Sequence, residues 1–247
     1  MIRFFMPMSG NVGDTLNVMP VLSGIYKSTG HKIHLVVKDK MKFFSGVKQF
    51  LEMQDCIYKL DFESDVKLDT TYNTLSLVSN FEKHPTRPWE TVRLDEHVRR
   101  NFNIEYTVDD DFIFKVDDQI FTTSKFLVGD RMYHSEMDGR RRFNTLLDSG
   151  KFPIEQCQYL DYNLPMATIA SMIKHSDKIL FTTFTGISTI ADLLNKEMVV
   201  LWGDDLINWD DKPIEYSYNK HFYRDRKSKL IYLGDFNITD YEVTNEV

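Results

Sequence analysis

The sequence predicts an α/β protein whose parallel sheets form two halves facing a cleft. An apolar run at 2–6 is followed by a glycine-bearing turn and a segment with helical spacing. A second strand–turn–helix pattern recurs at 178–189, and strand-like and helix-like segments alternate between the two. This alternation is typical of parallel sheets built from right-handed βαβ units. Ligands bind where such strands end, so two of these turns predict a cleft between two halves.

The first half is expected to span residues 1–118. Apolar residues such as Phe43, Val47 and Phe50 recur at helical spacing, and Pro85 and Pro88 break the chain before a charged helix. The expected strands lie at 2–6, 31–37, 56–60 and 72–78, and the expected helices at 14–28, 40–53 and 89–102. The acidic residues 109–111 and 117–118 mark the passage to the second half.

The second half is expected to span residues 119–247. Pro165 suits a first helical turn, because its missing N–H would have no helical partner there. The expected strands lie at 125–129, 158–160, 178–182 and 198–202, and the expected helices at 138–148, 165–175 and 187–195.

Length, charge and cysteine content restrict the function classes. The chain has 247 residues and a net charge of −7, so any contact with nucleic acid or anionic lipid must come from local patches. Two such patches are Arg99-Arg100 and the run 223–229. The two cysteines, Cys56 and Cys157, are far apart and indicate buried thiols in a reducing compartment. No apolar run is long enough to span a bilayer, and we expect a cytoplasmic protein.

Asp14 is the first candidate catalytic residue. It follows Gly13 at the start of a predicted helix, where an aspartate is a favourable cap. The same position would allow its carboxylate to act as a general base at the floor of a cleft. Both interpretations remain open from the residues alone. The turn residues Gly10, Asn11 and Gly13 would form the acceptor or phosphate side of this site through their backbone N–H groups.

The turn at Thr185-Gly186 is the candidate donor site. Glycine permits close approach of the backbone, and the following helix offers unpaired N–H groups and the positive end of its dipole to a diphosphate. The hydroxyl groups of Thr185, Ser188 and Thr189 would add hydrogen bonds. A simple helix cap is the alternative. No Gly-Lys-Ser/Thr sequence follows, so the turn is not a P-loop.

Several of these stretches resemble the bacterial heptosyltransferase-like glycosyltransferases. The opening Gly13-Asp14-Thr15-Leu16-Asn17-Val18-Met19-Pro20 is similar to the family's N-terminal Gly-Asp-Val-Leu-x-x-x-Pro signature. Residues 163–180 resemble its leucine-proline helix and the strand that leads to a glycine turn, and residues 190–203 resemble the following helix and strand. Two departures stand out, since the family usually has Asp at the position of Phe184 and His at the position of Thr189.

The resemblance implies a GT-B architecture, with two Rossmann-like domains and a nucleotide sugar bound mainly by the second. It implies metal-independent, inverting transfer, with Asp14 as the catalytic aspartate and Thr185-Gly186 as the nucleotide-binding turn. On this basis we expect Asp14 and Gly186 to face each other across a gap wide enough for one activated monosaccharide. The donor would be a nucleotide-diphosphate sugar, with no further cofactor.

A metal-free transferase must neutralise the departing diphosphate with cationic side chains or helix N-termini. Arg131, which follows a predicted strand, and Arg140, which opens a basic helix, are the preferred candidates. No metal site is expected. The histidines show no ligand spacing, and Asp109-Asp110-Asp111, although it contains an Asp-x-Asp, is interpreted as a solvated loop.

The sequence is compatible with two classes of acceptor molecule. One is a cell-surface glycan or glycolipid, and the other is a hydroxymethylated DNA base, as modified by a compact phage-type enzyme in the host cytoplasm. A non-catalytic nucleotide-binding module of the same fold and a sugar-nucleotide epimerase are the alternative functions. The sequence sets neither the donor sugar nor the oligomeric state.

Overall fold

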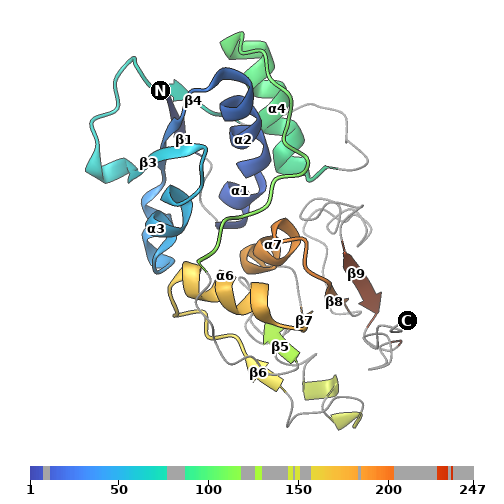
Figure 1. The fold of residues 1–247 in the computed structure, drawn as a ribbon. Coiled ribbons are helices and arrows are strands. Elements are labelled where there is room, and N and C mark those ends of the chain that lie inside the picture. The colour runs from blue at the N-terminus through green and yellow to red at the C-terminus, as the bar shows by residue number, and fades with distance from the viewer. Residues whose placement is uncertain are drawn as a thin grey trace.

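A computed structural model describes residues 1–7, 12–76, 87–117, 126–129, 144–146, 148–150, 157–182, 185–202, 227–232 and 235. The chain forms two α/β halves, each built around one parallel sheet (Figure 1). The predicted fold class, an α/β protein with two parallel sheets, is confirmed. The predicted boundary between residues 118 and 119 lies outside the described ranges.

The first sheet has the strand order β3-β2-β1-β4, and all of its pairings are parallel. β1 (Ile2–Met6) and β2 (Ile33–Val37) occupy its centre, and β3 (Ile57–Phe62) and β4 (Asn73–Thr74) form its edges. β2 is buried along its whole length, as expected for a central strand covered on both faces. Of the predicted strand at 72–78, residues 73–74 form β4 and residues 77–78 lie outside the described ranges, and the Leu75 N–H also donates to the Phe5 carbonyl at 2.7 Å.

The predicted helix at 14–28 is two helices, α1 (Val12–Asn17) and α2 (Met19–Thr29). Pro20 stands in the first turn of α2, where its missing N–H has no helical partner, and the chain turns at Val18 between the two helices. α4 (Trp89–Phe102) has the predicted bounds. The break after Asn17 separates the short helix that carries Asp14 from the longer α2.

The predicted helix at 40–53 is likewise divided. A 3₁₀ helix, η1 (Asp39–Phe43), is followed by Gly46 in the left-handed region (φ 68°) and then by α3 (Val47–Glu52). A second 3₁₀ helix, η2 (Glu63–Asp65), follows β3. The left-handed conformation suits glycine and ends any continuous helix at this point. It also brings the backbone of Ser45 and Gly46 against the second half, as described below.

The second sheet has the order β6-β5-β7-β8-β9 and is also parallel throughout. The predicted helix at 138–148 lies mostly outside the described residues, of which 144–146 are helical, and the other predicted strands and helices of this half are present in order. The elements are β5 (Phe126–Gly129), β6 (Cys157–Tyr159), α6 (Met166–His175), β7 (Lys178–Phe181), α7 (Gly186–Leu193), β8 (Met198–Trp202) and β9 (Ser228–Tyr232). Pro165 is the N-cap residue of α6, one position before the predicted first turn.

The edge strand β9 was not predicted. It pairs with β8 from Met198↔Ser228 to Trp202↔Tyr232, so the end of the basic run 223–229 belongs to a sheet edge. Lys229 forms a 3.7 Å ion pair with Glu197. Cationic side chains on an edge strand keep other strands from pairing with it.

Of the two cysteines, Cys56 is buried as predicted, whereas Cys157 on the edge strand β6 is only half-buried.

The two halves share one continuous hydrophobic core. Leu16 and Leu22 of the first half and Ile187 and Ile190 of the second belong to the same cluster of buried side chains. α3 also contacts α6, where the Met166 N–H donates to the Ser45 carbonyl at 2.7 Å. In Figure 1, α1 and α3 accordingly lie against α7 and α6. The halves are therefore packed directly on each other at these helices.

The segment 103–117, which we call the strap, leads from α4 toward the second half (Figure 1, green). Gln54, two residues after the end of α3, holds the strap through two bonds to Lys115, one from the Lys115 N–H (2.8 Å) and one to the Lys115 carbonyl (3.1 Å). The Phe114 N–H donates to the Leu193 carbonyl of α7 at 3.1 Å. The strap thus bonds to both halves.

No helix in the described ranges has the length and apolar character needed to cross a membrane.

Candidate active site

Asp14 lies in the first turn of α1, after the carboxyl end of β1, and is half-buried. In parallel α/β sheets this end of the strands carries the ligand site. A carboxylate in the first turn is also stabilised by the helix dipole. The predicted neighbours Gly10 and Asn11 lie outside the described residues.

The N-terminus of α7 forms a reciprocal cap. The Ser188 N–H donates to Thr185 Oγ1 (3.2 Å), and the Thr185 N–H donates to Ser188 Oγ (3.0 Å). Ser188 Oγ also donates to the Thr185 carbonyl at 2.6 Å, and the Ser188 residue is fully buried. The Ser188 hydroxyl therefore serves the cap in this structure, rather than facing a donor as expected. The N–H groups of Gly186 and Ile187 begin the helix and have no intrahelical acceptor.

Gly13 and Gly186 are in contact, which joins the two predicted half-sites, the turn before Asp14 and the Thr185-Gly186 turn. A Cβ on Gly186 would meet Val12 Cγ1 and would lie 2.7 Å from the Gly13 nitrogen, and a Cβ on Gly13 would lie 3.1 Å from Gly186 Cα. α1 and α7 are in extensive contact around this point. The structure thus places Gly13, the residue before Asp14, against Gly186 of the Thr185-Gly186 turn. The expected open gap is absent between these two glycines, because their backbones touch.

Asn17 and Thr189 are two further polar residues of these helices. Both are fully buried, and neither the Asn17 amide atoms nor Thr189 Oγ1 has a hydrogen-bond partner in the described part of the chain. Thr189 was predicted as a donor-binding residue and is not exposed here. Asn17 was missed. Its signal was a single amide in an otherwise apolar stretch, four residues after Gly13.

Arg131 and Arg140 lie outside the described residues, as does Phe184, one of the two departures from the family pattern. Their proposed contacts with a diphosphate remain predictions.

The acidic run is a loop that is solvated only in part, since Asp110 and Asp111 are exposed as predicted, whereas Asp109 is held against α2. Asp109 accepts from Ser23 Oγ at 2.6 Å and pairs with Lys27 Nζ at 2.7 Å, which attaches the strap to α2. Asp110 accepts two bonds from the Arg87 guanidinium, at 2.9 and 3.0 Å. Two of the three carboxylates are therefore occupied by cations of this chain. Within the described residues, no group of three or more His, Cys, Asp or Glu side chains could hold a metal ion.

A buried carboxylate on the first sheet has an unusual set of partners. Asp61 of β3 accepts from His34 Nε2 (2.9 Å), Lys48 Nζ (3.1 Å) and Lys59 Nζ (2.6 Å). Burial alone would raise its pKa, but the bonds from Lys59, Lys48 and His34 outweigh burial and lower the pKa to about 2. Asp61 is thus ionised at neutral pH. It joins β3, β2 and α3 rather than the half-sites at Gly13 and Gly186.

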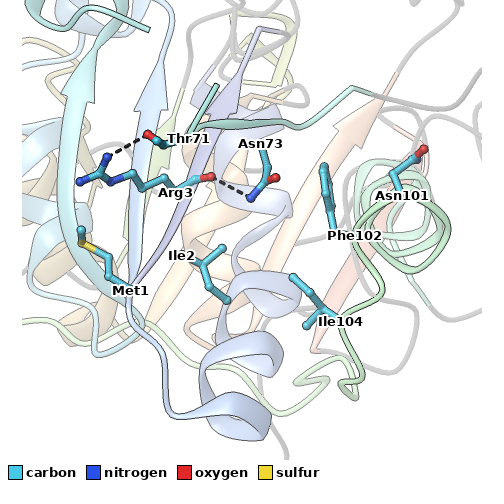
Figure 2. A pocket seen from close by; sticks show the side chains of 8 residues that line it. All are labelled: Met1, Ile2, Arg3, Thr71, Asn73, Asn101, Phe102 and Ile104. Carbon is cyan, nitrogen blue, oxygen red and sulfur yellow. Dashed lines mark hydrogen bonds between the residues drawn. The ribbon is translucent and has the colours of Figure 1, made fainter. Parts of the chain in front are cut away.

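A hollow of about 700 Å³ lies at the opposite end of the first sheet. Figure 2 shows the apolar side chains of Ile2, Phe102 and Ile104 and the polar side chains of Arg3, Asn73 and Asn101 around it. Arg3 donates to Thr71 Oγ1 at 2.9 Å, and Asn73 Nδ2 donates to the Arg3 carbonyl at 3.3 Å. Ile2 begins β1 and Asn73 begins β4, so the hollow lies at the amino ends of the strands, away from Asp14.

Solved glycosyltransferase structures share this architecture. The E. coli ADP-heptose LPS heptosyltransferase II superposes with a TM-score of 0.60 at 10% identity, covering 96% of this chain and 95% of that one. The glycosyl transferase family 9 protein of Veillonella parvula gives 0.59 at 10% identity, covering 94% and 86%. E. coli heptosyltransferase WaaC, solved with ADP, gives 0.54 at 11% identity, covering 96% and 94%.

No protein-family model matches the sequence, and no curated protein matches it significantly. The structural likeness extends over nearly the whole chain, at 10–11% identity. The chain therefore has the two-domain GT-B fold of the heptosyltransferases.

Proposed function

We propose that this protein is a glycosyltransferase that moves a sugar from a nucleotide-diphosphate sugar to an acceptor hydroxyl. The observation that carries the proposal is the contact between Gly13 and Gly186, which places the carboxylate-bearing turn of α1 beside the N-terminus of α7. A carboxylate beside a site suited to diphosphate is what an inverting, metal-independent transfer needs. The shared fold of the heptosyltransferases supports the same conclusion.

In this mechanism Asp14 removes the proton of the acceptor hydroxyl as its oxygen attacks the anomeric carbon. The new C–O bond forms on the face opposite the nucleotide, the bond to the diphosphate breaks, and the nucleoside diphosphate leaves with the electron pair. Negative charge grows on the leaving group, so the α7 N-terminus stabilises the transition state more than the ground state. Arg131 and Arg140 would add cationic charge to the same group.

Asp14→Asn tests the role of the base. The substitution keeps the shape of the side chain but removes its basicity, so we expect kcat to fall by about 10²–10⁴-fold. The binding of nucleoside diphosphate should stay close to that of the wild type. The assay is nucleotide release from a panel of UDP-, ADP- and GDP-sugars, together with thermal shift by the same ligands. Asp111→Asn, which removes a charge from an exposed residue of the strap, is the matched control.

The acceptor is tested separately. A glycolipid acceptor predicts transfer to lipid-linked sugar with little effect of salt. A hydroxymethylated base predicts retention on duplex DNA that falls steeply as salt rises, with the base flipped out for reaction. The net charge of −7 opposes DNA binding over the whole surface, so that version depends on local basic patches.

A non-catalytic nucleotide-binding module is the second candidate function. The use of the Ser188 hydroxyl in the cap and the burial of Thr189 favour it, because both reduce the polar groups available to a donor. Nucleotide release or sugar transfer by the wild-type protein that is lost in Asp14→Asn would exclude this candidate. Saturable nucleotide binding without any turnover would favour it.

A further inference from the structure

We propose that Asn17 is a specificity-determining residue of the same site, whose amide binds hydroxyl groups of the transferred sugar when α1 and α7 separate. The inference rests on the proposed function. It starts from two buried polar groups, Asn17 and Thr189, that have no hydrogen-bond partner in the regions described.

The Asn17 amide can donate two hydrogen bonds and accept two. Both of its polar atoms are buried without a partner, although the Asn17 backbone carbonyl accepts from Thr91 Oγ1. Folded proteins satisfy the large majority of their buried polar side chains, because an unmade bond in the interior is unfavourable. An orphaned amide of this kind points to a second state in which it has partners.

The position of Asn17 indicates what those partners are. Residues four apart share one face of a helix, so Asn17 lies on the face of Gly13, which touches Gly186. Thr189 is three residues after Gly186 and lies on the corresponding face of α7. The two orphaned groups are thus on the faces through which α1 and α7 meet, about one helical turn (roughly 5 Å) from the glycine contact.

The chemistry of the pair favours a sugar over a diphosphate. An amide together with a hydroxyl offers both donors and acceptors, which matches the neighbouring hydroxyl groups of a sugar ring. A diphosphate only accepts hydrogen bonds, and the N–H groups at the start of α7 already suit it. Asn17 therefore distinguishes the sugar part of the donor from its nucleotide part.

Replacing Asn17 with leucine tests the inference without any substrate. Leucine has a similar size and leaves no polar atom unsatisfied, so we expect the ligand-free protein to gain roughly 2–4 °C in Tm. Thr189→Val, which is nearly isosteric, should change Tm in the same direction. An asparagine with a merely structural role would instead lower Tm when replaced.

Gln54→Leu is the matched control, because Gln54 is an equally buried amide whose bonds are made. Its Nε2 donates to the carbonyls of Phe50 (2.8 Å) and Lys115 (3.1 Å), and its Oε1 accepts from the Lys115 N–H. This substitution should lower Tm. Opposite signs for two buried amides would separate an orphaned polar group from a structural one.

The second readout compares UDP, ADP and GDP with the same nucleotides carrying a hexose. Asn17→Leu should weaken binding of the nucleotide sugar about 3- to 10-fold, the size of one or two lost hydrogen bonds, with little change for the free nucleotide. An unchanged ratio of these affinities, or a fall in Tm, would overturn the role of Asn17. If either outcome is found while the wild type transfers sugar and Asp14→Asn does not, the role of Asn17 is refuted and the proposed glycosyltransferase function still stands. If the wild type binds no nucleotide sugar, both proposals fall.

Discussion

The backbone of Gly186 rests against that of Gly13, so that a Cβ added at 186 would lie only 2.7 Å from the Gly13 nitrogen. Glycine is the one residue that allows two helices from different halves of the chain to touch at their first turns. This contact sets the distance between Asp14 and the start of α7.

Replacing Gly186 with alanine should push α7 away from α1. The added methyl meets both Val12 Cγ1 and backbone atoms of Gly13, and backbone cannot rotate out of the way. We expect a loss of about 1–3 kcal/mol in the free energy of unfolding, measured by urea denaturation, with reduced transfer. Gly13→Ala, whose methyl would lie 3.1 Å from Gly186 Cα, should cost less. Equal effects of the two variants would contradict this contact geometry.

The attachment of the strap to α2 should depend on Asp109 and not on Asp111. Asp109 has a side chain that is 8% exposed and has two partners, Ser23 and Lys27. Asp109→Ala leaves the Ser23 hydroxyl without its acceptor, so the free energy of unfolding should fall by about 1–3 kcal/mol. Asp111→Ala changes an exposed residue and should stay within about 0.5 kcal/mol of wild type. Urea denaturation of both variants measures the difference.

Asp61 should make stability depend on pH in the acidic range. Its pKa is lowered from 3.8 to about 2 in the folded protein, so folding favours the ionised form. The stabilisation, about 2 kcal/mol, is complete well above pH 3.8 and is lost as pH falls through about 2. Asp61→Asn should therefore be less stable than wild type at pH 7, with a difference that shrinks toward pH 2. A difference that is constant over this range would show that the carboxylate charge is not responsible.

The cap of α7 should behave as one cooperative unit. Thr185→Ala removes the oxygen that accepts from the Ser188 N–H, and Ser188→Ala removes the oxygen that accepts from the Thr185 N–H, so each should lower the free energy of unfolding by about 1 kcal/mol. Because each bond holds the backbone that the other needs, the loss of one loosens the other, and the double variant should lose less than the sum of the single losses. Strict additivity in thermal or urea unfolding would mean that the two side chains act independently.

Much of the architecture could be predicted from local patterns. Helix α4 and strand β8 have the predicted bounds, because apolar periodicity and the preceding prolines are properties of short stretches of chain. The divided helices were missed, since Pro20 and Gly46 interrupt stretches whose apolar spacing continues across them. β9 was missed because charged residues surround it, and only its pairing with β8 makes it a strand.

Within the site, the sequence by itself determined that a carboxylate and a Thr-Gly turn each follow a strand and begin a helix. Only the tertiary structure decided that Gly13 meets Gly186 and that Asn17 is buried without a partner. Periodicity and turn chemistry act over a few neighbouring residues. Both of these properties depend on contacts that form only when the chain folds, and the contact between α1 and α7 joins segments from opposite halves of the protein.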